Sequence, residues 1–178
     1  MSGVSAEEPS VSAKSAVVYE YGTGKVVFSK NADARLPMAS TTKIMTALIA
    51  LEEGNLSDMV KIGANAQGVE GSSMYLKAGE TLSLSDLLYG LMLTSGNDAA
   101  VAIAEHIAGS EEAFAEKMTA RAKSLGCVNT QFKNANGLPD KDHFTTATEL
   151  ARITGKALEN DTFRTIVSSK STKIGGRT

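Results

Sequence analysis

The sequence has little of what metal centres and disulfide frameworks need. Cys127 is the single cysteine among 178 residues, which excludes an internal disulfide and a zinc site built on cysteines. Its position after Leu125 and Gly126 is typical of a buried apolar residue rather than a reactive thiol. The histidines, His106 and His143, have no third ligand at metal-site spacing. We therefore expect no metal site and a structural role for both histidines.

Long apolar runs and runs of basic residues are missing as well. No stretch approaches the length that crosses a bilayer. The formal net charge of −2 and the absence of a basic run give no support for nucleic-acid binding. The polar start lacks the apolar core of a signal peptide and is typical of a mature N-terminus. We expect residues 1–12 to form a disordered tail and the rest to form one domain.

Local patterns predict one hairpin followed mainly by helices. Residues 15–20 and 25–29 are rich in β-forming side chains and flank a turn containing two glycines, which predicts a β-hairpin. Short β-like pieces occur at 59–62 and 74–76, and 170–174 could be a strand. Periodicity, caps and propensity predict helices over residues 40–53, 82–93, 98–107, 111–125 and 147–158, with a short one after 161.

The most informative pattern is the pair Ser40 and Lys43. A helix is predicted to begin here, because Pro37 ends any earlier helix and the residues after Lys43 have good helix propensity. Residues three apart share a helix face, so the hydroxyl and the amine would be neighbours. In an apolar cleft at a helix N-terminus the pKa of Lys43 would fall, and a neutral amine could accept the Ser40 proton.

Helix capping is the alternative role for Ser40. Serine and threonine are favoured N-cap residues, and one hydroxyl among Ser40, Thr41 and Thr42 is expected to cap the helix. A capping box would place Glu or Gln at position 43, where this chain has a lysine, whose charge the helix dipole disfavours by about 0.3–1 kcal/mol. The Ser-x-x-Lys pattern is weak by itself, so its context decides.

A second candidate pair, Ser95 and Asn97, lies between two predicted helices. The first of these helices ends near Leu93 and the second begins at Asp98, which places both residues on a tight turn. A purely structural interpretation is available here too. Gly96 could supply the left-handed cap of the first helix, while Asn97 or Asp98 caps the second.

Together, residues 37–43 (PMASTTK) and 93–100 (LTSGNDAA) resemble the active-site serine penicillin-binding proteins. Ser-Gly-Asn at the second motif is the form found in the low-molecular-weight D-alanyl-D-alanine carboxypeptidases. The likeness runs from residues 16–19 through 136–138 and 145–147 to 175–178. The chain thus resembles the N-terminal part of that catalytic domain, with residues 1–178 forming one incomplete domain.

The family's third motif, Lys-Thr-Gly or Lys-Ser-Gly, does not occur in this chain. The resemblance implies an α/β (α+β) fold with an antiparallel sheet flanked by helices and a helical subdomain, whose C-terminal strands are not encoded here. A two-stranded hairpin is marginal alone in water. We therefore expect the hairpin edge and the apolar face of helix 44–51 to be uncovered, until a separate chain or a swapped copy completes the sheet.

The resemblance also implies a reaction. Ser40 would attack the terminal D-Ala–D-Ala bond of a peptidoglycan stem peptide, Lys43 would accept its proton, and Ser95 would relay the proton to the leaving amine. Asn97 would hold the substrate amide, and the Ser40 N–H would be one oxyanion donor. No metal or organic cofactor is needed, β-lactams would act as inhibitors, and the substrate implies an extracytoplasmic location.

Two alternatives stay open at this point. A related serine acyl enzyme, either a DD-endopeptidase or a β-lactamase, shares the motifs, although the segment 149–152 does not offer the glutamate and asparagine of class A β-lactamases. The second alternative is a non-catalytic module that binds peptidoglycan, which the absence of the third motif supports. For the same reason we expect the chain alone to lack carboxypeptidase activity.

Overall fold

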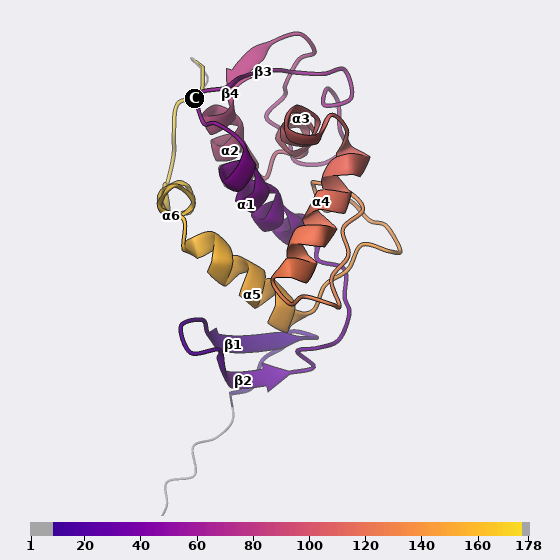
Figure 1. Ribbon diagram of the computed structural model, residues 1–178, viewed down its shortest axis with the longest axis vertical. Coiled ribbons are helices and arrows are strands. Elements are labelled where there is room, and N and C mark those ends of the chain that lie inside the picture. Colours follow the sequence, from indigo (N-terminus) through magenta and orange to yellow (C-terminus); the bar gives the residue numbers. More distant parts are fainter. Residues whose placement is uncertain (1–8, 176–178) are drawn as a thin grey trace, which may run out of the picture.

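The computed structural model describes residues 9–175. Residues 1–8 of the expected tail lie outside the described residues, and its disorder stays a prediction. Figure 1 shows a mainly helical body with a strand pair at either end. In chain order the elements are β1 (Ala16–Glu20), β2 (Lys25–Lys30), the 3-10 turn η1 (Ala39–Thr42), α1 (Lys43–Glu53), β3 (Met59–Lys61), β4 (Thr81–Ser83), α2 (Leu84–Leu93), α3 (Asn97–Ala108), α4 (Glu111–Ser124), α5 (Ala147–Leu158) and α6 (Asp161–Ser168).

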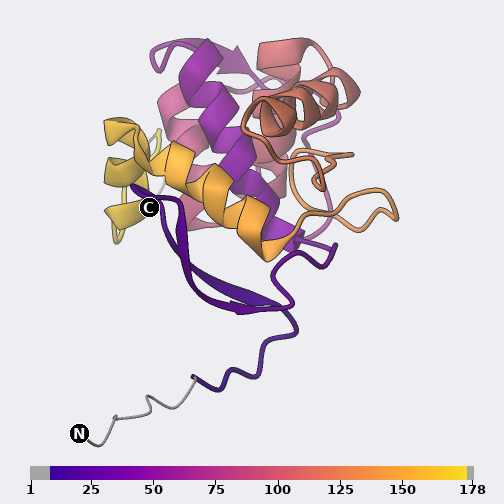
Figure 2. The same ribbon diagram turned by 60° about the horizontal axis from the view of Figure 1, so that its bottom comes forward.

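Helix α1 lies at the centre of the helical body (Figures 1 and 2). Every residue from Met45 to Ala50 is buried, because α1 packs against each of the other five helices of the described chain. Large apolar side chains from those helices complete the core, among them Leu87, Ile103 and Phe114. Burying each such side chain stabilises the fold by about 1.5–3 kcal/mol. The expectation that the apolar face of this helix is uncovered is therefore wrong.

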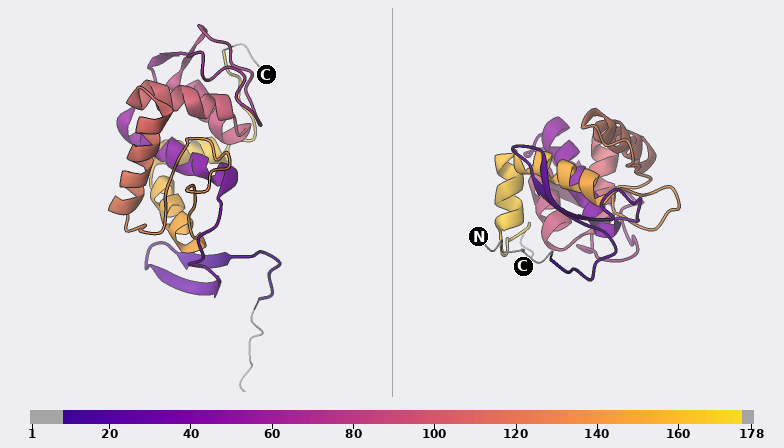
Figure 3. Two further views of the ribbon diagram at one scale, coloured as in Figure 1. Left: turned by 90° about the vertical axis from the view of Figure 1, so that its right-hand side faces the viewer. Right: turned by 90° about the horizontal axis from the view of Figure 1, so that it is seen from below.

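The predicted hairpin is present and lies against α5 at one end of the molecule (Figure 3). β1 and β2 are antiparallel, with Glu20 opposite Lys25 and a register shift after Val18. Within residues 9–175 these two strands pair only with each other, and the side chains of Val18 and Val27 are 53% and 63% exposed. Within the described residues the hairpin edge is therefore unpaired, as expected, although β1 packs against α5.

The second strand pair differs in part from the prediction. β3 lies where a strand is expected, and its antiparallel partner is β4, which includes Leu82, a residue predicted to be helical. The predicted β-like piece at 74–76 is not a strand. Its amides at Met74 and Leu76 donate to the carboxylate of Asp98 instead of to a neighbouring strand.

The helices follow the sequence prediction closely. The side chain of Ser110 caps α4, and that of Thr146 caps α5, each by accepting an amide hydrogen three residues on at 3.1 Å. Residues 170–174, a possible strand, form an irregular segment beside Tyr89 and Leu93 of α2. Across residues 9–175, each helix falls short of the length and apolar character that crossing a membrane requires.

Candidate active site

Ser40 lies in the 3-10 turn that leads into α1, and it is exposed. The predicted hydroxyl cap is wrong. Thr42 occupies the N-cap position of α1, but its side chain makes no capping hydrogen bond. Met38 occupies that position in the 3-10 turn, and Thr41 Oγ1 donates to the Met38 carbonyl at 2.5 Å instead of accepting an amide hydrogen. Because the first amides of a helix have no acceptor within it, the Ser40 N–H is available to an external acceptor. Ala39, just before it, has a φ of 45°, which is unusual for a non-glycine residue.

Lys43 is the buried cation of the site, and only 2% of the residue is exposed. Its Nζ donates to Ser40 Oγ at 3.2 Å, to Asn97 Oδ1 at 2.7 Å and to the Asn136 carbonyl at 2.7 Å. In the part of the chain that the structure describes, these acceptors are all neutral and Lys43 forms no ion pair. Burial lowers the pKa of Lys43 to about 8, in the direction the sequence predicts.

The turn between α2 and α3 brings the second motif to Lys43. Asn97 is the first residue of α3 and is buried, with Oδ1 facing the lysine and Nδ2 donating to the Glu70 carbonyl at 2.5 Å. The left-handed conformation predicted for Gly96 is wrong: Ser95 adopts it, with a φ of 57°, whereas Gly96 has a φ of −60°. For a residue with a Cβ this conformation costs about 1–2 kcal/mol.

The four predicted site residues do not all contact Lys43. Ser40, Lys43 and Asn97 form one hydrogen-bonded group. Ser95 is half-buried and lies two residues before Asn97, and its hydroxyl is not among the hydrogen-bond partners of Lys43 within residues 9–175. Asn97 also contacts the lysine itself, a role that the sequence analysis did not give it.

A loop over residues 134–138 also supports this group. Besides the Asn136 carbonyl, the Ala135 carbonyl accepts from Thr46 Oγ1 of α1 at 2.7 Å. Gly137 has a φ of 95°, and a Cβ there would lie 2.0 Å from the Ala39 carbonyl oxygen. Half-buried Glu111, whose pKa is raised by burial, accepts the Ala135 N–H at 3.0 Å. The sequence singled out Asn136-Gly137-Leu138 only as part of the family likeness.

His143, for which the sequence analysis expected no metal-binding role, contacts the turn that carries Ser40 and Lys43. Its Nδ1 accepts the Lys133 N–H at 3.0 Å, so in the neutral ring the proton is assigned to Nε2, which lies 2.7 Å from Thr42 Oγ1. Burial lowers the pKa of His143, which favours this neutral form. The ring thus links the loop at 133 to the residue before Lys43, a contact that nothing in the local sequence indicates.

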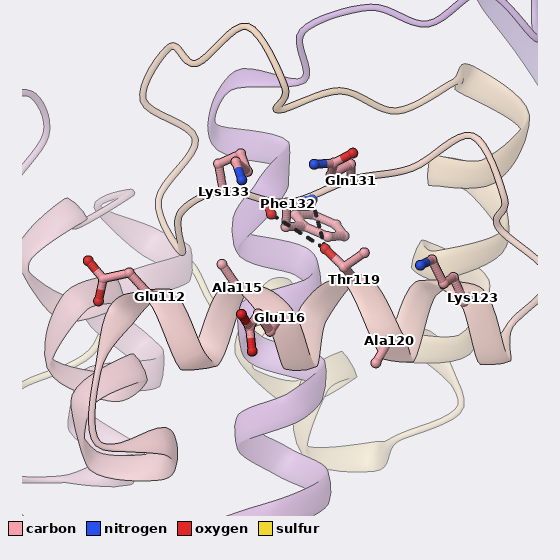
Figure 4. A pocket seen from close by; sticks show the side chains of 9 residues that line it. All are labelled: Glu112, Ala115, Glu116, Thr119, Ala120, Lys123, Gln131, Phe132 and Lys133. Atoms are coloured by element: carbon pink, nitrogen blue, oxygen red, sulfur yellow. Dashed lines mark hydrogen bonds between the residues drawn. The ribbon is translucent and has the colours of Figure 1, made fainter.

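A cleft of about 390 Å³ adjoins Ser40 and is lined by residues including Met38, Ala39, Gly137 and His143. A second hollow, of about 550 Å³, lies on the outer face of α4 and is drawn in Figure 4. Its lining carries both charges, with Glu112, Glu116 and Lys123 on the helix and Lys133 opposite. None of the four predicted site residues lines it. The smaller cleft reaches the turn that carries Ser40 through Met38 and Ala39, although none of the four predicted site residues lines it either.

The sequence analysis gave the remaining candidates, Cys127 and His106, structural roles. Cys127 is fully buried, and burial raises its pKa to about 11, which keeps it a thiol. His106 lies near the end of α3 and contacts Asp58 at 3.3 Å. Among the described residues, no three His, Cys, Asp or Glu side chains gather in a way that could hold a metal ion.

A serine hydroxyl hydrogen-bonded to a buried lysine whose pKa is lowered is an arrangement that can activate a serine nucleophile. Comparison with known proteins agrees: residues 2–174 match the D-alanyl-D-alanine carboxypeptidase (peptidase S11) family, and the chain belongs to this family. The likeness to penicillin-binding proteins drawn from the motifs is thereby confirmed.

The similar proteins carry the corresponding names. The chain is 45% identical over 152 residues to D-alanyl-D-alanine carboxypeptidase DacF of Bacillus subtilis, which covers 83% of this chain and 39% of that protein. It is 41% identical over 166 residues to DacC of Escherichia coli, covering 87% and 41%. The solved structure of a Streptomyces DD-transpeptidase variant is 34% identical with a TM-score of 0.88, covering 94% of this chain and 70% of that one. The predicted fold class is confirmed.

These shares show that the chain spans about two fifths of the length of the curated relatives it matches, 39% of one and 41% of the other. The matched part contains Ser40, Lys43, Ser95 and Asn97. The Lys-Thr-Gly motif is absent from it.

Proposed function

We propose that this chain is the part of a serine D-alanyl-D-alanine carboxypeptidase that carries the nucleophile and its base. The observation that supports this most is the 3.2 Å hydrogen bond between Ser40 Oγ and Lys43 Nζ, with the lysine buried and its pKa lowered to about 8. A buried lysine without a carboxylate partner is costly to a fold. Catalysis gives that cost a reason, since such an amine can lose its proton near neutral pH.

The proposed steps follow from these positions. Neutral Lys43 takes the Ser40 proton while Oγ attacks the carbonyl of the terminal D-Ala–D-Ala bond, and the Ser40 N–H stabilises the oxyanion. Ser95 passes a proton to the departing D-Ala amine, and Asn97 Nδ2, which has a second hydrogen, holds the acyl-side carbonyl. Water then hydrolyses the acyl-enzyme. A β-lactam presents a similar carbonyl and would leave Ser40 acylated.

The substrate we infer is a peptidoglycan stem peptide ending in D-Ala–D-Ala, which would place the protein outside the cytoplasmic membrane. We also infer a partner, the polypeptide that carries the Lys-Thr-Gly strand. The unpaired edges of β1 and β2 and the exposed Val18 and Val27 support this, because further strands on the hairpin would cover them. A separate chain or a second, swapped copy could supply such strands.

The chemistry at Glu149 argues against a class A β-lactamase. Its carboxylate is buried and accepts from the Asn129 N–H at 2.9 Å and from the Thr130 hydroxyl, so it is occupied in holding a loop rather than a water. A DD-endopeptidase would use the same four residues and is the closest alternative reaction. A peptidoglycan-binding module without catalysis is the other alternative, and the experiment below separates it.

The test is covalent labelling by penicillin. The probe mixture contains this chain and a complementing segment, defined as the part of the Bacillus subtilis relative's catalytic domain that follows the matched region. Intact mass should show one penicilloyl adduct, and peptide mapping should place it on Ser40. Ser40→Ala should abolish the adduct with an unchanged melting temperature. An adduct on Ser95, or one that survives Ser40→Ala, would refute the assignment.

A further inference from the structure

The segment 70–76 follows β3 in the chain and is held against the first residues of α3. Asp98 is fully buried, and its carboxylate accepts from Ser73 Oγ at 2.6 Å and from the amides of Met74 and Leu76 at 3.0 Å each. A carboxylate with this many donors fixes the path of the backbone that supplies them. The Asp98 carboxylate therefore holds segment 70–76 in a fixed position next to Asn97.

The same segment fixes the side-chain amide of Asn97. The Asn97 backbone N–H donates to the Ser72 carbonyl at 2.7 Å, and Nδ2 donates to the Glu70 carbonyl at 2.5 Å. Since Nδ2 is tied to a carbonyl on one side, Oδ1 must face the other side, where it accepts from Lys43 Nζ at 2.7 Å. A flipped amide would set oxygen against the Glu70 carbonyl and N–H against the ammonium, and both contacts would be repulsive.

Gly71 leaves the space that this amide needs. Its φ is 94°, and a Cβ at this position would lie 2.7 Å from Asn97 Nδ2. Gly68, three residues earlier, has a similar φ of 77°, but a Cβ there would have nothing within 4 Å. Both glycines are exposed. Alanine imposes a comparable backbone strain at either position, but only at position 71 does its methyl group meet the Asn97 amide.

We propose that the Glu70-Gly71 backbone is a positioning element for the base of this site. It orients the Asn97 amide, and through Asn97 Oδ1 it holds the Lys43 ammonium beside Ser40. The role of Lys43 as base rests on the proposed function. The orientation of the amide, and its effect on the lysine, can be measured without catalysis.

The experiment compares Gly71→Ala with the matched control Gly68→Ala in the full chain. The pKa of Lys43 is read from the carbon-13 shift of its Cε in lysine-labelled protein, and the signal is identified by its loss in Lys43→Arg. Displacing Asn97 Oδ1 removes an acceptor that favours the ammonium, so Gly71→Ala should lower the Lys43 pKa below its starting value. Gly68→Ala should leave that pKa unchanged.

Acylation by penicillin, with the complementing segment present, should fall at least about tenfold in Gly71→Ala, because a base displaced from the nucleophile loses its positioning advantage. It should stay near normal in Gly68→Ala. Equal Lys43 pKa values in the two variants would overturn the proposal. A moved pKa with no acylation in any variant would instead count against the proposed function and leave the positioning role standing.

A second measurement applies if Gly71→Ala does not fold. In the unsubstituted chain the Asn97 side-chain NH₂ should exchange with solvent much more slowly than those of exposed asparagines, because one of its hydrogens is bound to the Glu70 carbonyl. Exchange as fast as that of the exposed side chains would show that the amide is free to turn. That result would overturn the proposal as well.

Discussion

At the scale of single residues, the site depends on one lysine whose surroundings suit two protonation states. Three neutral acceptors, including Ser40 Oγ, satisfy the ammonium, while burial favours the neutral amine and lowers the pKa to about 8. No carboxylate fixes the charge within residues 9–175. A nearby anion would raise the pKa and remove the base from use at neutral pH.

The rate of Ser40 acylation should therefore depend on pH through Lys43. With a pKa of about 8, the neutral fraction rises about tenfold per pH unit below 8 and levels off above it. Measured with the complementing segment present, acylation by penicillin should follow that curve. Lys43→Arg should abolish acylation, because arginine cannot lose its proton. A flat profile between pH 6 and 8 would contradict the base role.

At the scale of elements, the start of α1 is held from three directions. The turn before α3 supplies Asn97, the loop at 134–138 supplies the Asn136 carbonyl, and His143 contacts Thr42. None of these segments is near Lys43 in the sequence. The site is thus a meeting of loops around the end of a buried helix, which gives the side chains a rigid support.

His143 predicts a pH dependence of stability. Burial lowers its pKa in the folded chain, so protonation favours the unfolded state, whose histidine has a pKa of about 6.5. The contribution is intact above about pH 6.5 and is lost as pH falls toward the lower folded value. The melting temperature should drop on going from pH 7.5 to 5.5, by about 2–4 °C for each kcal/mol of stability lost.

The matched variant for this prediction is His143→Asn. Its Oδ1 can accept the Lys133 N–H in place of Nδ1, but it cannot be protonated. The variant should be less stable at pH 7.5 and should show a smaller loss between pH 7.5 and 5.5 than the unsubstituted chain. An equal loss in both proteins would mean that other groups cause the acid sensitivity.

At the scale of the whole molecule, a well-packed helical body carries a two-stranded hairpin at one end. The core around α1 is closed, whereas the hairpin leaves Val18 and Val27 exposed and pairs with no other strand of the described chain. The packed core around α1 therefore does not depend on any further strand beside the hairpin. The helices hold Ser40 and Lys43 in place, whereas under the proposed function the second oxyanion donor and the groups that bind the substrate carboxylate would belong to the third motif, which this chain lacks.

The chain alone should accordingly show no appreciable carboxypeptidase activity. Losing one oxyanion donor typically costs about 10²–10³ in rate, and losing the strand that binds the substrate adds to this. D-Ala release from an acyl-D-Ala–D-Ala peptide should appear only when the complementing segment is added. Hydrogen exchange of the β1 and β2 amides should slow at the same time. Full turnover by the chain alone would show that the third motif is dispensable.

The sequence by itself determined the helices, the hairpin and the family. These depend on local causes: caps such as Ser110 and Thr146, apolar periodicity, and the spacing of Ser40 and Lys43 within one turn. The neutral, buried state of Cys127 also followed from its neighbours. Such features need only residues close in the chain.

The tertiary structure alone decided which groups surround Lys43 and which residue of the turn before α3 takes the left-handed backbone conformation. Asn136, Glu70 and His143 reach the site from loops up to 101 residues away, and no local pattern indicates their contacts with it. The left-handed residue is Ser95 rather than Gly96, and α1 is covered although its predicted neighbours in the sheet are absent. The physical reason is common to these cases: burial and long-range hydrogen bonds override local propensity, and they exist only once the chain has folded.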